Sequence, residues 1–285
     1  MLEILEDTLI DTIKLLPFLF VTYLIMEYIE HKISKKNKET IKKSGKLGPL
    51  FGGLVGIIPQ CGFSVSATNL YAARVISLGT LITVYLTTSD EMLPILISEA
   101  VPIITILQIL AIKFVIGVFF GFVIDLILRR KKDSMDNQNE YIEDICEHEH
   151  CNCKEEGILK SSIKHTLNIL IYIFIITLVI NAVVEFVGED NIANFVGNYA
   201  FLGPFISSLI GLIPNCAASV IITNLYLQNI INGASLIAGL LTGAGVGLIV
   251  LFRINKNVKE NIRIVALLYA IGAFSGVILQ LFQVL

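Results

Sequence analysis

Residues 47–71 read LGPLFGGLVGIIPQCGFSVSATNLY, and residues 202–226 read LGPFISSLIGLIPNCAASVIITNLY. The two stretches align without a gap at an offset of 155 residues. Over residues 47–87 and 202–242 the aligned segments are identical at 19 of 41 positions, including proline, cysteine and asparagine. Identity at this level over a fixed offset is the mark of an internal repeat. The chain therefore carries a tandem duplication.

The same offset extends the duplication to the flanking apolar segments. It carries Ile10–Ile29 onto an apolar segment near Lys164–Val187, and Val101–Leu128 onto the final one near Lys256–Leu285. The residues before the first apolar segment are acidic, unlike a cleavable signal peptide, so we expect that segment to be retained. We therefore expect a first transmembrane repeat, a polar linker and a second transmembrane repeat, over residues 1–128, 129–163 and 164–285.

The composition places most of the chain in a lipid bilayer. Of its 285 residues 55% are hydrophobic and 16% are charged, and the mean hydropathy is +0.78. A membrane-spanning helix needs about 20 mostly apolar residues, and apolar runs fill the chain outside residues 31–46, 129–164 and 253–263. This pattern excludes a soluble enzyme and a nucleic-acid partner. The predicted fold class is an all-α polytopic membrane protein.

The distribution of positive charge predicts the orientation of the repeats. Of the 21 lysines and arginines, 18 lie in the three polar segments, and the exceptions are Lys14, Arg74 and Lys113. Positively charged loops favour the cytoplasmic side, so the first apolar segment runs inward and its copy runs outward. We expect two inverted-topology repeats of about five helical elements each, with both termini outside the plasma or inner membrane. Secondary transporters commonly use this arrangement, with the substrate bound near the midplane at the repeat interface.

Pro59 and Pro214 interrupt segments that are otherwise suited to a helix. Proline lacks a backbone N–H and disfavours helical geometry at the residue before it. Each break lies about 18 Å from the start of its segment, near the middle of a hydrocarbon core about 30 Å thick. Half-helix ends present carbonyls to cations and amides to anions, and Gln60 and Asn215 add side-chain amides. We expect the two breaks to meet near the bilayer midplane.

Four further repeated residues follow the breaks. Cys61 and Cys216 start the second half-helices. A helix N-terminus favours the thiolate form of a cysteine, which is a soft metal ligand. Asn69 and Asn224 lie about two turns further on, as ligands or as interhelical hydrogen-bonding residues. Simple packing of prolines and cysteines is the alternative, but their retention in both copies favours a binding site.

A second interruption differs between the repeats. Thr87-Thr88-Ser89-Asp90-Glu91 corresponds to the uncharged stretch Thr242-Gly243-Ala244-Gly245-Val246. Acids inside a membrane segment are costly and are usually functional. Asp90 and Glu91, together with Thr87, Thr88 and Thr242, are therefore candidate binding residues. The alternative is an external loop over Ser89–Pro94 that emerges from the membrane.

Lys113 lies at a similar depth to these acids. At 1.5 Å per residue, Asp90 is about 20 Å and Lys113 about 22 Å from the cytoplasmic ends of two successive spans. We expect Lys113 to be the resting counter-ion of Asp90 or Glu91, with a substrate cation or protons competing for the acids. A lysine that snorkels to the membrane surface is the alternative.

The linker contains a dense tract of metal-binding residue types. Its candidate ligands are Cys146, His148, His150, Cys151 and Cys153. This density suits zinc or a softer metal, although the spacing matches no zinc-finger pattern. We expect either an accessory cytoplasmic metal site or a disordered acidic linker.

The repeated motifs resemble those of the ten-helix heavy-metal exporters, distant relatives of the arsenic permeases whose members are often labelled manganese transporters or arsenic efflux proteins. The resemblance rests on IPQCGFS and IPNCAAS, on the two TNLY motifs and on TTSDEMLP, and it covers essentially the whole chain. Ten helices count each half-helix as one element. The resemblance implies that the pore residues are Pro59, Gln60, Cys61, Pro214, Asn215, Cys216, Asp90 and Glu91.

These observations predict a secondary transporter that exports a divalent transition metal. Mn²⁺ suits hard oxygen ligands, and protons are the expected coupling ion. Zn²⁺ or another heavy metal is an alternative substrate, and a homodimer is an alternative to a monomer. We expect that no cofactor is required. The alternative is efflux of an arsenical or an oxyanion through Cys61 and Cys216. An intramembrane enzyme is disfavoured because no histidine accompanies the cysteines, and the chain has no ATP-binding loop of the GxxxxGK[ST] type.

Overall fold

The computed structural model describes residues 5, 8–10, 12–17, 19–21, 23–24, 47–89, 91–129, 158–187 and 202–282, and all regular structure among them is helical. The first repeat contributes α3 (Gly48–Gly56), α4 (Gly62–Ala72), α5 (Leu78–Thr87), α6 (Met92–Ser98) and α7 (Ile103–Arg129). The second contributes α11 (Gly203–Gly211), α12 (Cys216–Leu227), α13 (Gly233–Thr242), α14 (Gly247–Ile254) and α15 (Val258–Leu281). Between them lies α9 (Ile158–Val187), which begins inside the segment assigned to the linker.

The helix boundaries recur along the chain. Four of the five corresponding helices begin 155 residues apart, as α3 does at Gly48 and α11 at Gly203. The fifth pair, α4 and α12, begins at Gly62 and at Cys216. The offset found in the sequence therefore reappears as an offset between helices.

Corresponding helices of the two repeats begin with the same local interactions. Ser77 accepts a hydrogen bond from the Thr80 N–H at the start of α5, and Asn232 accepts one from the Ser235 N–H at the start of α13. A side-chain acceptor at this position satisfies an N–H that has no partner within the helix. A proline occupies the first turn of both α3 and α11, where its missing N–H removes no helical bond.

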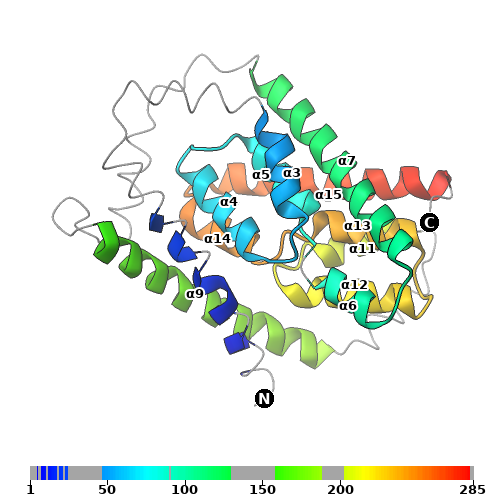
Figure 1. Cartoon of the computed structure of the whole chain (residues 1–285), viewed down its shortest axis with the longest axis horizontal. Coiled ribbons are helices and arrows are strands. Elements are labelled where there is room, and N and C mark those ends of the chain that lie inside the picture. The colour runs from blue at the N-terminus through cyan, green and yellow to red at the C-terminus, as the bar shows by residue number, and fades with distance from the viewer. Residues whose placement is uncertain are drawn as a thin grey trace.

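The helices pack in two equivalent groups joined by α5 and α13. In one group α3, α5 and α7 contact one another, and in the other α11, α13 and α15 do (Figure 1). Between the groups, α4 packs on α14 and α12 packs on α6, while α5 contacts α13. Exchanging the two halves converts each cross-contact into the other and leaves the α5–α13 contact unchanged. This reciprocity is the property of a two-fold interface.

The N-terminal helical residues pack along α9. Thr8 accepts a hydrogen bond from the Asn181 side chain near the end of α9, at 2.9 Å. Leu15 and Leu19 belong to the same buried cluster as Ile169 and Ile173 of α9. Since the start of one segment lies at the end of the other, the two run in opposite directions, as Figure 1 shows at the edge of the molecule.

Many large apolar side chains of the described residues are exposed. Within the described residues, three helical stretches have the length and hydropathy to cross a membrane: Ile103–Leu128, Gly233–Ile254 and Val258–Leu281. Large apolar side chains on α7 point outward, including Val115, Phe119 and Leu126. A bilayer is the solvent in which such a surface is stable.

Close helix contacts give the first testable prediction. At Gly211 a Cβ atom would collide with the Gly239 carbonyl of α13 and with the Thr242 hydroxyl. We expect Gly211→Ala to lower the free energy of unfolding by about 1–3 kcal/mol, because the two helices must separate. Thermal unfolding in detergent measures this loss. Gly243→Ala is the matched control, since its nearest neighbours would lie 3.7 Å away, and an equal loss in both variants would contradict the explanation.

Candidate functional site

Both proline breaks form the same backbone turn. The N–H of Gln60 donates to the Ile58 carbonyl at 2.8 Å, and the N–H of Asn215 donates to the Ile213 carbonyl at 2.7 Å. The carbonyls of Ile57 and of Leu212 accept no backbone N–H of the described residues outside the helices. The predicted helix breaks are therefore present, and each leaves a carbonyl at the end of the first half-helix.

The second half-helices begin at the predicted cysteines. Cys61 is the N-cap residue of α4, and Cys216 is the first residue of α12. Both side chains are buried, and both belong to one apolar cluster that also contains residues of the N-terminal segment and of α9. The two repeats thus contribute their cysteines to a shared interior.

The side-chain amides beside the prolines are held by the outer helices. Gln60 Nε2 donates to the Lys14 carbonyl at 3.2 Å, which orients the amide oxygen away from that carbonyl. Asn215 Nδ2 donates to Asn181 Oδ1, and Asn181 Nδ2 donates to Thr8 Oγ1. The N-terminal segment and α9 therefore position one repeated amide each. Asn181 was missed by sequence reasoning, and an asparagine in an apolar segment was the available signal.

A hydroxyl group lies one helical turn from Asn181. Thr177 is 2% exposed, and its Oγ1 has no hydrogen-bond partner among the described residues. Residues four apart share a helix face, so Thr177 lies on the face that holds Asn215. An unpaired buried hydroxyl is unfavourable, and a polar substrate or a water molecule would satisfy it.

The bond between Asn181 and Asn215 gives a second prediction. We expect Asn181→Ala to raise the substrate concentration at half-maximal transport by roughly fivefold, since one hydrogen bond contributes about 1 kcal/mol. Concentration-dependent flux in proteoliposomes measures this. Asn168→Ala on the same helix is the control, because Asn168 is half-buried and makes no side-chain hydrogen bond within the described residues. Equal behaviour of the two variants would remove Asn181 from the site.

The second pair of breaks lies where the sequence predicts, after α5 and after α13. Thr87, Thr88 and Ser89 are all buried. Lys113 of α7 is 1% exposed, and its Nζ donates to the Thr88 carbonyl and to Ser89 Oγ, the latter at 3.4 Å. The lysine therefore does not snorkel to the membrane surface, and its ammonium group reaches the residues that directly precede the two acids.

The acids themselves are described only in part. Asp90 lies outside the described residues, and Glu91 is half-buried at the start of α6. Pairing of Lys113 with either acid stays a prediction. At the corresponding positions the second repeat has Gly245, Val246 and the buried Leu268. The charged residues of this interruption thus belong to one repeat alone.

The remaining break residues in the second repeat are uncharged. Thr242 is buried. Its hydroxyl lies within hydrogen-bonding distance of two carbonyls, that of Ser208 at 2.8 Å and that of Gly239 at 2.9 Å. Gly245 has φ 54°, a conformation that favours glycine. Thr242 therefore joins α11 to the end of α13, next to a sharp turn of the backbone.

The two repeated asparagines have different surroundings. Asn69 is 1% exposed, accepts a hydrogen bond from Tyr23 Oη at 3.2 Å and donates to the Val65 carbonyl at 3.1 Å. Asn224 is half-buried and makes no side-chain hydrogen bond within the described residues. Asn69 thus joins α4 to the N-terminal segment, as expected for interhelical hydrogen bonding.

A polar contact between the repeats was not predicted. Tyr85 is fully buried on α5, its hydroxyl lies 2.5 Å from Thr68 Oγ1, and both hydroxyls lie 3.2 Å from the Gly247 carbonyl. Gly247 begins α14 in the second repeat. This contact joins α4 and α5 to α14 in the interior, and the second repeat has Leu240 in place of Tyr85.

The linker candidates Cys146, His148, His150, Cys151 and Cys153 lie outside the described residues, as do residues 25–46. Among the described residues no group of three or more His, Cys, Asp or Glu side chains converges.

Comparison with known families agrees with the helical membrane architecture. Residues 2–190 match the family described as "Putative, 10TM heavy-metal exporter". Comparisons with curated proteins and with solved structures find no match. The matched range covers the first repeat and α9, which is more than half of the chain. The chain therefore belongs to this ten-helix heavy-metal exporter family, and it is a multi-pass membrane transporter and not an enzyme.

Proposed function

We propose that the protein is a secondary transporter that exports a divalent transition metal, with Mn²⁺ as the main substrate and protons as the coupling ion. The observation that carries this proposal is the buried contact of Lys113 with Thr88 and Ser89, next to Asp90 and Glu91. A buried ammonium group needs a nearby negative charge, and the two acids are adjacent in sequence. A metal ion that displaces the ammonium would bind the same carboxylates.

The donor set favours a hard cation. The proposed donor set combines the acids with the amide of Gln60, the amide of Asn215 and the hydroxyls of Thr87 and Thr242, which lie at the helix breaks. Carboxylate, amide and hydroxyl oxygens suit Mn²⁺ better than they suit soft metals. Protonation of the acids weakens their hold on a metal, which links metal release to proton binding.

Inverted repeats would place this donor set between two rocking halves. The opposite directions of the N-terminal segment and α9 support the inversion, because these two segments occupy corresponding places in the repeats. The reciprocal contacts α4–α14 and α12–α6 support a two-fold relation between the halves. In such transporters the site is opened alternately to each side of the membrane.

A second candidate substrate is trivalent arsenic or an oxyanion. The observation that favours it is the shared buried cluster that contains Cys61 and Cys216. Thiolates are soft ligands, and the half-helix amides after each break would accept an anion. In this alternative the acids are dispensable and the two cysteines are required.

Flux measurements in proteoliposomes test the proposal. The flux of Mn²⁺, of Zn²⁺ and of arsenite through the purified protein is measured at equal concentrations, with and without an imposed pH difference. We expect Mn²⁺ flux that responds to the pH difference. Flux that follows the metal gradient alone would indicate a channel, and transport of arsenite alone would replace this proposal by the cysteine-centred alternative.

A further inference from the structure

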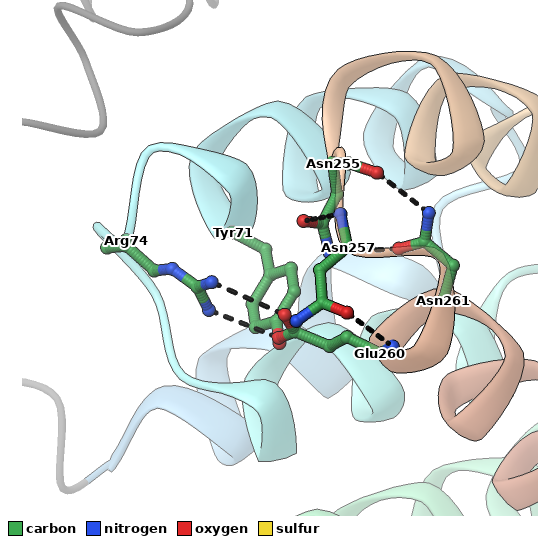
Figure 2. A network of polar contacts seen from close by, with 6 residues as sticks. All are labelled: Tyr71, Arg74, Asn255, Asn257, Glu260 and Asn261. Carbon is green, nitrogen blue, oxygen red and sulfur yellow. Dashed lines mark hydrogen bonds and ion pairs between the residues drawn. The ribbon is translucent and has the colours of Figure 1, made fainter.

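An ion pair joins the two repeats at one end of the helices. Arg74 follows α4, and its guanidinium contacts both carboxylate oxygens of Glu260 in the first turn of α15, at 3.2 and 3.4 Å. Tyr71 also donates a hydrogen bond to Glu260, and the Arg74 guanidinium lies 5.4 Å from the centre of the Tyr71 ring. Figure 2 shows the three side chains converging from α4 and α15.

Three asparagines hold the start of α15 in place for this contact. Asn257 accepts a hydrogen bond from the Glu260 N–H at 3.2 Å. Asn255 and Asn261 bond to each other, and Asn261 also donates to the Asn255 carbonyl (Figure 2). These bonds hold the turn between α14 and α15, and thereby position the Glu260 side chain toward α4.

This end of the molecule faces the cytoplasm in the proposed orientation. Three positive residues flank Glu260 in sequence: Arg253 at the end of α14, Lys256 in the turn before α15 and Lys259 in its first turn. Positive charge of this density marks the cytoplasmic side. The segment after Arg74 is also bound to the end of α7, where Asp125 accepts hydrogen bonds from Ser77 Oγ and from the Gly79 N–H.

The ion pair has no counterpart at the other end. The offset of 155 residues places Asn229 where Arg74 would be and Thr105 where Glu260 would be, while Tyr226 matches Tyr71. The backbone is conserved, since Arg74 and Asn229 both have φ 58°. In the corresponding turn after α6, Glu99 is exposed and pairs with no cation of the described residues.

We propose that Tyr71, Arg74 and Glu260 form a one-sided latch that closes the cytoplasmic end of the transport path. The latch holds α4 of one repeat against α15 of the other, and its release lets the halves separate on the cytoplasmic side. Within the described residues the opposite end has no such ion pair, so the resting population favours closure toward the cytoplasm. This inference rests on the proposed transport between two moving halves.

The latch is suited to shifting a population. Arg74 and Glu260 are 26% and 19% exposed, and partly exposed ion pairs contribute little to overall stability. A few contacts present in one state alone still change the ratio of two states by about three- to tenfold. The expected signature is therefore a change in accessibility and not a loss of folding.

Thiol labelling of the native interior cysteines tests the latch. The background variant replaces Cys146, Cys151 and Cys153 by serine and keeps Cys61 and Cys216, both buried. A membrane-impermeant maleimide is applied to the cytoplasmic face in inside-out vesicles. We expect Glu260→Gln to raise the labelling rate about three- to tenfold. The charge exchange Arg74→Glu with Glu260→Arg should restore most of the slow rate, and the exposed neighbour Lys259→Gln should leave it unchanged.

A second experiment transfers the ion pair to the corresponding positions at the other end of the helices. We expect Asn229→Arg combined with Thr105→Glu to slow labelling from the outer face in right-side-out vesicles, because a latch is created there. Unchanged rates in both Glu260→Gln and the transferred pair would overturn the proposal. Labelling needs no substrate, so altered rates without Mn²⁺ flux would reject the transport proposal and keep the latch, and Mn²⁺ flux with unaltered rates would do the reverse.

Discussion

Transport by Asp90→Asn and by Glu91→Gln is expected to fall by about 10- to 100-fold, because each loses a charged ligand worth about 1.5–3 kcal/mol. Both replacements keep the size of the side chain and remove its negative charge. Glu91 is half-buried at the start of α6, in the turn that Lys113 contacts. Initial rates of Mn²⁺ flux in proteoliposomes measure the loss.

Glu99→Gln is the control for these two variants. Glu99 lies at the other end of α6, is exposed and pairs with no cation of the described residues. We expect its flux to match that of the unmodified protein. Full flux in both Asp90→Asn and Glu91→Gln would show that the acids belong to an external loop.

Replacement of Lys113 by methionine is expected to lower the free energy of unfolding by about 3–5 kcal/mol. Removal of one partner of a buried ion pair leaves the other charge without compensation. A second replacement, Asp90→Asn or Glu91→Gln, should recover most of this stability and thereby identify the partner. Thermal unfolding of the single and double variants in detergent measures both effects.

Lys259→Met serves as the control for Lys113→Met, since Lys259 is exposed at the start of α15. It should unfold at the temperature of the unmodified protein. The counter-ion hypothesis is wrong if Lys113→Met is destabilised to the same extent with and without each second replacement, because independent effects simply add.

The repeat and its breaks could be predicted from the sequence because their causes are local. Pro59 and Pro214 interrupt a helix whatever surrounds them. The closeness of Lys113 to the interruption before Asp90 could also be predicted, because the rise of a helix per residue is constant. The rise predicts a similar depth for Lys113 and Asp90, and the ammonium group contacts Thr88 and Ser89, directly before Asp90 in sequence.

The contacts between distant segments could not be predicted in the same way. Asn181 reaches Asn215 only because α9 packs beside the second break. Tyr85 meets Gly247 only because α14 packs on α4, which itself packs on α5. In each case the neighbouring sequence does not show which distant residue will be the partner. The contact depends on the tertiary arrangement. The start of α9 at Ile158 was likewise hidden by the polar composition of the preceding segment.

The central claim is a carboxylate-centred site for a metal cation coupled to protons. The most direct test records metal-driven proton movement in proteoliposomes with the unmodified protein, with Glu91→Gln and with the pair Cys61→Ser and Cys216→Ser. We predict a response to Mn²⁺ that disappears in Glu91→Gln and persists in the cysteine variant. A response that persists in Glu91→Gln and disappears in the cysteine variant, or transport of arsenite alone, would contradict the claim.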